Sequence, residues 1–273
     1  MGKFTGVLLA TDYDDTLYDS AGTISRENRQ AIDRFVAQGG LFCISTGRSY
    51  INFAIQMARE HRPVNTPVIL SNGASIYDFA REESLWLQVL PPEAPRHLAQ
   101  VCRVFPQVGF EAYHQDEVYT FRPNAITQKH LARCHLTGQP RAIGDMPTPW
   151  IKVILQHPDT KVLEGVQAYL LAQWPQVYDV TFSNPTLLEV TAQGANKGLS
   201  VLWVANHMGV SREHIYCVGN GMNDIPMLEV SALSFAPANS YDQVLAAADI
   251  ILPSCDESCV ARMIEVLEQR YQK

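Results

Sequence analysis

The sequence predicts an α/β fold: a doubly wound parallel sheet covered by helices, with a smaller α+β unit inserted into it. Over residues 7–70, short apolar runs alternate with amphipathic stretches, a rhythm typical of β-α-β-α-β units. From about residue 80, strand-like segments with polar alternation are mixed with two helical stretches, as in an α+β domain. Near Gly194 the first pattern resumes.

The first predicted strand, residues 7–10, ends directly in carboxylates. Its length and its boundaries fit a buried parallel strand better than a helix, and Asp12, Asp14 and Asp15 follow it. The carboxyl ends of strands are where open α/β sheets bind ligands. Three aspartates within four residues repel one another unless a cation or a basic partner is present. An Asx-rich turn and a metal-assisted acid/base pair both remain open at this point.

The next elements complete the predicted parallel sheet. Ser25 is a plausible N-cap for a helix in which Ile32, Phe35 and Val36 form an apolar stripe, and Gly39 follows its end. The remaining elements of this part are strands at 41–44 and 68–70 and a helix at 50–61.

Residues 83–189 are predicted to form the inserted unit. Its expected strands are 85–87, 118–121, 151–155, 180–182 and 187–190, its helices are 95–105 and 161–174, and residues 137–149 are expected to form a Gly- and Pro-rich surface loop.

Residues 190–273 return to the first domain, which therefore comprises 1–82 and 190–273. Pro226 falls in the first turn of a short helix, where proline is tolerated. The other expected elements are helices at 198–209 and 260–269 and strands at 215–218, 233–236 and 250–252.

Composition argues against several classes of protein. The 273 residues are 47% hydrophobic and 18% charged, as in globular proteins, and they suffice for one large domain or two ordinary ones. The net charge of −7 gives no basic field for nucleic acid or an anionic membrane. No apolar run could span a bilayer, and the N-terminal residues lack the core of a signal peptide. We expect a cytoplasmic monomer or homodimer with a small-molecule partner.

The six cysteines do not suggest a metal site or a disulfide framework. They form no Cys-x-x-Cys pair, and no histidine near Cys255 and Cys259 completes a zinc set. Reduced thiols are expected.

Four motifs carry a resemblance to a known superfamily. They are Asp12-x-Asp14-x-Thr16, Ser45-Thr46-Gly47-Arg48, Lys197 in a Gly-Ala-Asn-Lys-Gly loop, and the loop 219–224 that ends in Asn223-Asp224. In this order they resemble the haloacid dehalogenase (HAD) superfamily. Residues 70–74 (LSNGA) and 223–228 (NDIPML) look like its Cof-type sugar-phosphatase branch, subfamily IIB. The resemblance spans almost the whole chain and implies a Rossmann-like core with an inserted cap domain of the C2B type.

The resemblance implies phosphate-ester hydrolysis through an aspartyl-phosphate. Phosphoryl transfer needs a nucleophile, neutralised phosphoryl charge and a proton for the leaving group. Asp12 would be the nucleophile, and Asp14 would protonate the leaving oxygen and then activate water. Asp12 and the backbone carbonyl of Asp14 would also bind Mg²⁺, which prefers oxygen ligands.

The same comparison implies phosphate contacts from four places. The Thr46 hydroxyl and the Gly47 backbone N–H would bind one phosphoryl oxygen, and Lys197 another. The Tyr13 backbone N–H and Asn223 could also meet phosphate, or Asn223 a metal-bound water. A solvated surface lysine at 197 and helix N-caps at Thr46 and at Asn223 and Asp224 remain open alternatives.

Two positions depart from the pattern of the family. Asn220 stands where the family usually has Asp, so the remaining metal ligand would be the Asn220 amide, with weaker metal affinity or direct help from Asp224. Asp15 stands where the family usually has Gly, and Asp tolerates unusual backbone angles better than most residues.

These residues together predict a Mg²⁺-dependent phosphatase of small phosphorylated metabolites, sugar phosphates above all. The cap should select the substrate by closing over the site. Its polar candidates are each either ordinary surface or substrate contacts: His114, Tyr119, Arg122, Lys152 and Asn184. A phosphohexomutase of the same branch and a non-catalytic phosphate-binding protein are the alternatives.

Overall fold

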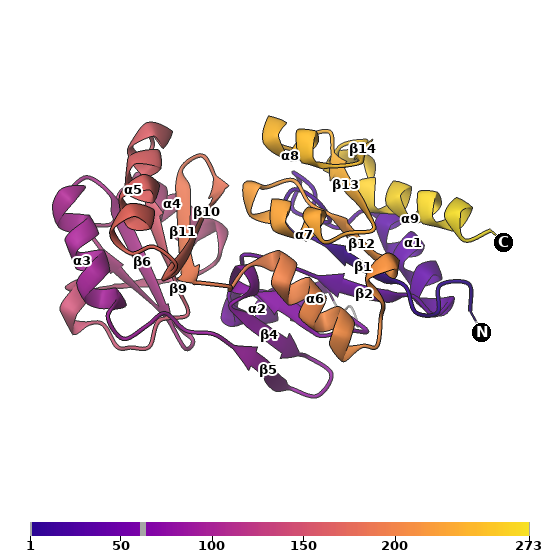
Figure 1. Cartoon of the computed structure of the whole chain (residues 1–273), viewed down its shortest axis with the longest axis horizontal. Coiled ribbons are helices and arrows are strands. Elements are labelled where there is room, and N and C mark those ends of the chain that lie inside the picture. The colour runs from indigo at the N-terminus through magenta and orange to yellow at the C-terminus, as the bar shows by residue number, and fades with distance from the viewer. Residues whose placement is uncertain (1, 61–63, 273) are drawn as a thin grey trace.

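The protein forms two lobes that lie side by side (Figure 1). The computed structural model describes residues 2–60 and 64–272. Both ends of the described chain lie on the lobe that contains the parallel sheet, here called the core lobe. The other lobe, here called the cap lobe, contains the strands β6 to β11. No helix among the described residues is long and apolar enough to cross a membrane.

The core lobe is built on a parallel sheet, as the sequence predicts. Its strand order is β14-β13-β12-β1-β2, and every pairing along it is parallel. The strands are β1 (Leu8–Thr11), β2 (Leu41–Ile44), β12 (Ile215–Val218), β13 (Leu233–Pro237) and β14 (Ile250–Leu252).

Helices cover both faces of this sheet, because successive strand residues point to opposite sides. Leu9 of β1 packs into one apolar cluster with Phe35 and Met263, while its neighbours Leu8 and Ala10 pack into another. The first cluster is covered by α1 (Arg26–Ala37), α2 (Tyr50–Glu60) and α9 (Cys259–Arg270), the second by α6 (Lys197–His207), α7 (Ile225–Glu229) and α8 (Asp242–Ala247).

Most of the predicted elements of this lobe are present. The Ser25 hydroxyl caps α1 by accepting the Asn28 N–H at 3.1 Å, as expected. Pro226 lies in the first turn of α7. Residue 61, predicted as the end of the second helix, lies outside the described residues, and α8 was not predicted.

The third predicted strand, β3 (Val68–Leu70), has a different partner from the one expected. One isolated bridge, Ser45 to Ile69, joins it to the parallel sheet within the described chain. The backbone takes positive φ angles at Ser71, Asn72 and Gly73, and the chain reverses there. Strand β3 therefore pairs antiparallel with β4 (Ser75–Asp78), and β4 with β5 (Glu83–Leu87).

The cap lobe contains a mixed, mostly antiparallel sheet of order β10-β11-β9-β6-β7-β8. Its strands are β6 (Gly109–His114), β7 (Glu117–Phe121), β8 (Gly138–Pro140), β9 (Lys152–Gln156), β10 (Tyr178–Asn184) and β11 (Leu187–Ala192). Its helices are α3 (Ala94–Val104), α4 (Ala125–Arg133) and α5 (Thr160–Gln173). Both β6 and α4 were missed, and the expected loop 137–149 contains β8.

The two faces of this sheet differ in chemistry. Phe110, Val153 and Leu188 point into the apolar cluster under α3 and α5. The residues next to them in sequence, Glu111, Lys152 and Glu189, are also buried, on the opposite side. This second side of the sheet faces the core lobe and supplies the charged wall described below.

The predicted domain limits can be compared with the strand pairing. Residue 83 begins β5, which pairs with β4 rather than with the cap sheet, and residue 189 lies inside β11. The division into 1–82, 83–189 and 190–273 remains a prediction, and the pairing favours limits after Leu87 and after Ala192.

Candidate active site

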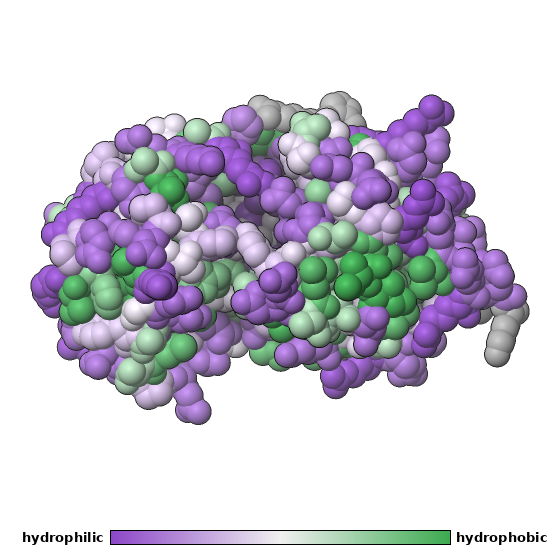
Figure 2. Space-filling view, turned by 90° about the horizontal axis from the view of Figure 1, so that it is seen from above, coloured by the Kyte–Doolittle hydropathy of each residue, from purple (hydrophilic) through white to green (hydrophobic). Residues whose placement is uncertain are grey.

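The candidate site lies where three strands of the parallel sheet end. Asp12 follows β1, Thr46 follows β2, and Asn220 follows β12. A cavity of about 500 Å³ opens there, lined by residues of both lobes. The surface is hollowed and mostly hydrophilic between the lobes (Figure 2). A cavity of this size suits a small organic ligand.

Lys197 lies between two buried carboxylates. Its Nζ donates to Asp12 Oδ1 at 2.6 Å and to Asp224 Oδ1 at 2.5 Å, and its side chain is fully buried. Burial lowers the pKa of Lys197, but the two carboxylates raise it by more, so the ammonium is retained. The interpretation of Lys197 as a solvated surface lysine is therefore wrong.

Asp12 has an unusual protonation equilibrium in this setting. Burial and the charge of Asp224 raise its pKa, the Lys197 ammonium lowers it, and the result is a pKa of about 7. With this pKa, Asp12 is only partly ionised near pH 7. A nearby cation would favour its charged form.

Asp224 organises the loop after β12. Its Oδ2 accepts the backbone N–H groups of Asn220 at 2.9 Å and Gly221 at 2.8 Å. A Cβ at Gly219 would lie 2.5 Å from the Asp224 carboxyl group, so only glycine fits there. Because both Asp224 oxygens are engaged, the geometry favours a role in orienting Lys197 and this loop. Direct metal ligation by Asp224 remains a prediction.

The Asn220 side-chain amide, Asp12 Oδ2 and the Asp14 backbone oxygen converge at one point. The Asn220 side-chain oxygen accepts the Thr16 hydroxyl at 2.9 Å. It also lies 3.1 Å from Asp12 Oδ2 and 3.1 Å from the Asp14 backbone oxygen. These acceptors repel one another unless the amide turns its NH₂ inward or a cation lies among them. Oxygen donors of this kind suit Mg²⁺, so the residues present fit the expected metal.

The described residues contain no cluster of three or more His, Cys, Asp or Glu side chains that could hold a metal ion. A metal here would therefore depend on the Asp14 carbonyl and the Asn220 amide as well as on the Asp12 carboxylate.

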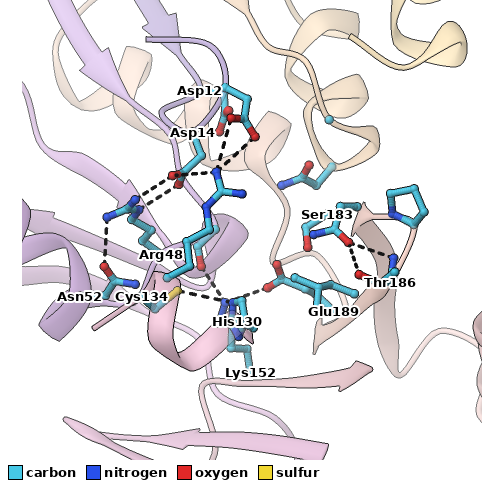
Figure 3. A pocket seen from close by; sticks show the side chains of 18 of the residues that line it. Asp12, Asp14, Arg48, Asn52, His130, Cys134, Lys152, Ser183, Thr186 and Glu189 are labelled. Atoms are coloured by element: carbon cyan, nitrogen blue, oxygen red, sulfur yellow. Dashed lines mark hydrogen bonds and ion pairs between the residues drawn. The ribbon is translucent and has the colours of Figure 1, made fainter. Parts of the chain in front are cut away.

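Arg48 holds the Asp14 carboxylate in a two-pronged ion pair (Figure 3). Its Nε donates to Asp14 Oδ2 at 2.9 Å and its Nη2 to Oδ1 at 2.7 Å. The guanidinium also lies 5.1 Å from the centre of the Tyr13 ring. The sequence shows Arg48 only as a member of its motif, and the pairing with Asp14 was not predicted.

The loop after β2 is buried and ordered by hydrogen bonds. Thr46 Oγ1 accepts the Arg48 backbone N–H at 3.1 Å, which leaves the Thr46 hydroxyl proton available to a ligand. Gly47 lies against the Asn72 side chain, where a Cβ would be 3.1 Å from Asn72 Oδ1. The same Asn72 oxygen accepts the Asn223 amide at 2.9 Å, so Asn223 is tied to this loop.

Asp15 adopts the left-handed backbone conformation, with φ of +58°. Aspartate thus occupies a turn position where the family usually has glycine. Its carboxylate also lies 3.3 Å from Arg133 of the cap lobe.

The cap lobe supplies a charged wall to the cavity. Lys152 Nζ donates to the Gly47 carbonyl at 2.7 Å and to Glu189 Oε2 at 2.8 Å. His130 Nδ1 lies 3.0 Å from the buried Glu111 carboxylate. Burial lowers the pKa of His130, but hydrogen bonds with Cys134 and Glu111 and the Glu111 charge raise it by more, to about 10.

The five polar cap candidates divide into two groups. Lys152 and Asn184 line the cavity, whereas His114, Tyr119 and Arg122 are not among its described lining residues. His114 and Arg122 bond to backbone carbonyls elsewhere in the lobe. Sequence reasoning missed the contribution of α4, which supplies His130 and Arg133.

Sequence comparison gives the family. Residues 9–264 match the haloacid dehalogenase-like hydrolases. The chain belongs to this family. The motif residues Asp12, Thr46 and Asn220 lie at the strand ends, and Lys197 lies in the first turn of α6. The predicted α/β core with an inserted cap is confirmed at the level of fold.

Named HAD relatives are similar over nearly their whole length. Two Bacillus subtilis 5-amino-6-(5-phospho-D-ribitylamino)uracil phosphatases, YitU and YcsE, are 26% and 27% identical. The matches cover 94% of this chain in both cases, and 96% and 94% of the two relatives.

Solved HAD structures share the fold. A haloacid dehalogenase-like hydrolase from Bacteroides thetaiotaomicron superimposes with a TM-score of 0.80 at 26% identity, covering 97% of this chain and 99% of that one. The HAD subclass IIB sugar phosphatase BT4131 superimposes with a TM-score of 0.83 at 22% identity, covering 96% and 98%.

Proposed function

We propose that the protein is a Mg²⁺-dependent phosphatase that hydrolyses small phosphorylated metabolites, with sugar and polyol phosphates as the favoured class. The observation that carries the proposal is the position of Asp12. One of its oxygens binds Lys197, and the other lies 3.1 Å from the Asn220 side-chain amide, at the edge of a cavity of about 500 Å³. The names of YitU, YcsE and BT4131 support the substrate class.

The reaction would proceed in two displacements. An Asp12 carboxylate oxygen attacks phosphorus, the bond to the leaving-group oxygen breaks, and Asp14 protonates that oxygen. Asp14 then takes a proton from a water whose oxygen attacks phosphorus, the bond between phosphorus and Asp12 breaks, and phosphate and the free Asp12 carboxylate are released. Lys197, the Thr46 hydroxyl and the Gly47 N–H would bind the phosphoryl oxygens, and Tyr13 and Asn223 remain predicted contacts. Bound Mg²⁺ would neutralise phosphoryl charge.

Asp14 must change partners to act as an acid. Both of its oxygens accept hydrogen bonds from Arg48, so one of them has to leave the guanidinium before it can meet the leaving-group oxygen.

The setting proposed for this activity is the cytoplasm, with the protein as a monomer or homodimer. All six cysteines, which lie in the described chain, are free, as a reducing compartment would maintain them. The negative net charge gives no support to a nucleic-acid partner.

Phosphate release from 4-nitrophenyl phosphate, with and without Mg²⁺, tests the proposal. Wild type should turn over only with the metal, and Asp12→Asn should lose at least ~10³-fold in kcat. Asp116→Asn, an exposed aspartate in the hairpin between β6 and β7, serves as the matched control and should stay active. An inactive wild type at saturating Mg²⁺ would refute the phosphatase assignment. Turnover that needs a bisphosphate and releases little phosphate would favour the phosphohexomutase.

Asn220→Asp tests the metal ligand set. A carboxylate in place of the amide adds charge beside Asp12 and the Asp14 carbonyl, so Mg²⁺ should bind roughly 10-fold more tightly or better. Calorimetric titration with Mg²⁺ measures this directly, independently of turnover. An unchanged dissociation constant would exclude Asn220 from the metal site.

A further inference from the structure

Lys152 makes a buried contact between the two lobes. It lies on β9 of the cap lobe, yet its Nζ donates to the backbone carbonyl of Gly47 on the core lobe at 2.7 Å. The Lys152 side chain is only 4% exposed. In Figure 3, Lys152 points toward Glu189 on the cap side of the cavity.

The cap lobe holds this ammonium from two further sides. Glu189 on the neighbouring strand β11 accepts a second hydrogen bond at 2.8 Å. The ring of Tyr113 on β6 lies 4.8 Å from Nζ. Burial raises the pKa of Glu189, but the charge and hydrogen bond of Lys152 lower it below its ordinary value, so the carboxylate is ionised.

Packing alone does not explain a buried ion pair at this position. Ile154, two residues along the same strand, lies on the same side and belongs to a small apolar cluster. Apolar residues of similar volume often stabilise a protein as well as a buried ion pair does, because both charges must be stripped of water. The burial of this ion pair therefore points to a functional role for Lys152.

The Gly47 carbonyl belongs to the peptide group that links Gly47 to Arg48 in the loop 46–48. The N–H of this planar group is that of Arg48, and it donates to Thr46 Oγ1 at 3.1 Å. The Arg48 side chain in turn holds Asp14. The hydrogen bond from Lys152 to the Gly47 carbonyl therefore fixes the orientation of this peptide group. The N–H of the same group in turn holds the Thr46 hydroxyl in place.

We propose that Lys152 is a positioning residue that orders the loop 46–48 when the cap lobe meets the core lobe. This inference rests on the proposed function, in which Thr46 and Gly47 bind the phosphoryl oxygens. Glu189 holds Lys152 in place. Loop order thereby depends on contact between the lobes, so the phosphate site is complete only when the cavity is covered.

The hydrogen-bond count argues against direct substrate binding by Lys152. An ammonium has three N–H donors. In the described structure one meets the Gly47 carbonyl, one meets Glu189, and the Tyr113 ring lies close enough to receive the third. A substrate contact would have to break one of these interactions.

Lys152→Met tests the proposal, with 4-nitrophenyl phosphate and a sugar phosphate as substrates. Misplacement of the loop should lower kcat ~10–100-fold for both substrates. The inhibition constant for inorganic phosphate should rise by a similar factor, since phosphate itself needs the loop. Lys161→Met, a change of the same type on the exposed side of α5, should leave these quantities within about twofold of wild type.

A second variant separates positioning from stability. Lys152→Met leaves Glu189 buried without its partner, so the double variant Lys152→Met/Glu189→Leu removes both charges. This double variant should unfold in urea at a concentration near that of wild type and still show the same losses in kcat and phosphate affinity.

Two results would overturn the inference. One is a double variant with the kcat and phosphate inhibition of wild type. The other is a rise in KM confined to the sugar phosphate, which would make Lys152 a leaving-group ligand. A wild type that releases no phosphate would instead refute the proposed function, so the two failures are distinct.

Discussion

At the scale of single residues, the buried charges around Asp12 determine what the site can do. Lys197 is the only described side chain that donates to both Asp12 and Asp224. Without its ammonium, two carboxylates would share a buried space, and one of them would have to take up a proton. A protonated Asp12 cannot act as a nucleophile.

Lys197→Met should therefore abolish turnover and also destabilise the fold. Breaking a buried ion pair by removing one partner costs about 3–5 kcal/mol. Urea unfolding without Mg²⁺ measures the stability, and phosphate release measures the activity. The exposed Lys161→Met control should change stability by less than about 0.5 kcal/mol. An active and equally stable Lys197→Met variant would contradict this account.

His130 makes stability depend on pH in the alkaline range. Its pKa is about 10 in the folded protein, against an ordinary value of 6.5. Between these values the folded state keeps a proton that the unfolded state has lost. The stabilisation is therefore complete below about pH 6.5 and disappears as the pH rises through 10.

Unfolding of wild type and His130→Gln between pH 7 and 10 tests this dependence. At pH 7 the variant should be less stable by about 3 kcal/mol, because Glu111 is left buried without its ionic partner. Its stability should fall less steeply than that of wild type as the pH rises. Parallel curves for the two proteins would show that His130 does not titrate as described.

At the scale of elements, the first turn of α6 places Lys197. Asn196 caps this helix through a hydrogen bond from the Leu199 N–H at 3.0 Å, and Lys197 is the next residue. The cap therefore determines where the helix starts and where Lys197 points. In α1 the same kind of cap is made by Ser25, which is not among the described residues that line the cavity.

Asn196→Ala and Ser25→Ala form a matched pair. Each should cost about 0.5–2 kcal/mol of stability through loss of an N-cap. Asn196→Ala should also lower kcat, since Lys197 moves with the frayed turn, whereas Ser25→Ala should keep wild-type kcat. Chemical denaturation and steady-state kinetics report the two effects, and equal kcat values would remove the link between this cap and Lys197.

The element that sequence reasoning missed most seriously is α4. Its apolar contacts are few: Ile126 and Leu131 pack against Tyr113 and Val118, and no long stripe marks the helix. One local signal could have revealed α4 in the sequence: Asn124 and Thr127 form a capping box at the start of this helix. Missing α4 meant missing His130 and Arg133, which line the cavity.

At the scale of the whole molecule, the two lobes have separate apolar clusters. The cluster around Leu188 and Val153 lies within the cap lobe, and those around β1 lie within the core lobe. The contact between the lobes described above is polar. A change inside one cluster should therefore act mainly on its own lobe.

Leu188→Ala tests this independence. Removing a fully buried leucine should cost about 2–5 kcal/mol. Amide hydrogen exchange should accelerate in β6, β9 and β11 and stay slow in β1 and β12. Equal loss of protection in both lobes would show that the chain unfolds as one cooperative unit.

The sequence by itself determined most elements of the core lobe and the residues at its strand ends. These depend on local signals: short apolar runs, the Ser25 cap, and polar motifs directly after strands. Lys197, in the first turn of α6, was named through the resemblance to the HAD superfamily, whereas Asp12, Thr46 and Asn220 each follow a strand. A parallel sheet brings the ends of neighbouring strands to one edge, so these residues were expected to meet.

Only the tertiary structure decided which charged groups pair. Arg48 with Asp14 and Lys152 with Gly47 join residues 34 and 105 positions apart. The chain reversal at 71–73, which turned β3 away from the parallel sheet, depends likewise on the backbone path. Such contacts follow from strand order and from the approach of the two lobes. Those are properties of the whole packed chain, and no local run of residues encodes them.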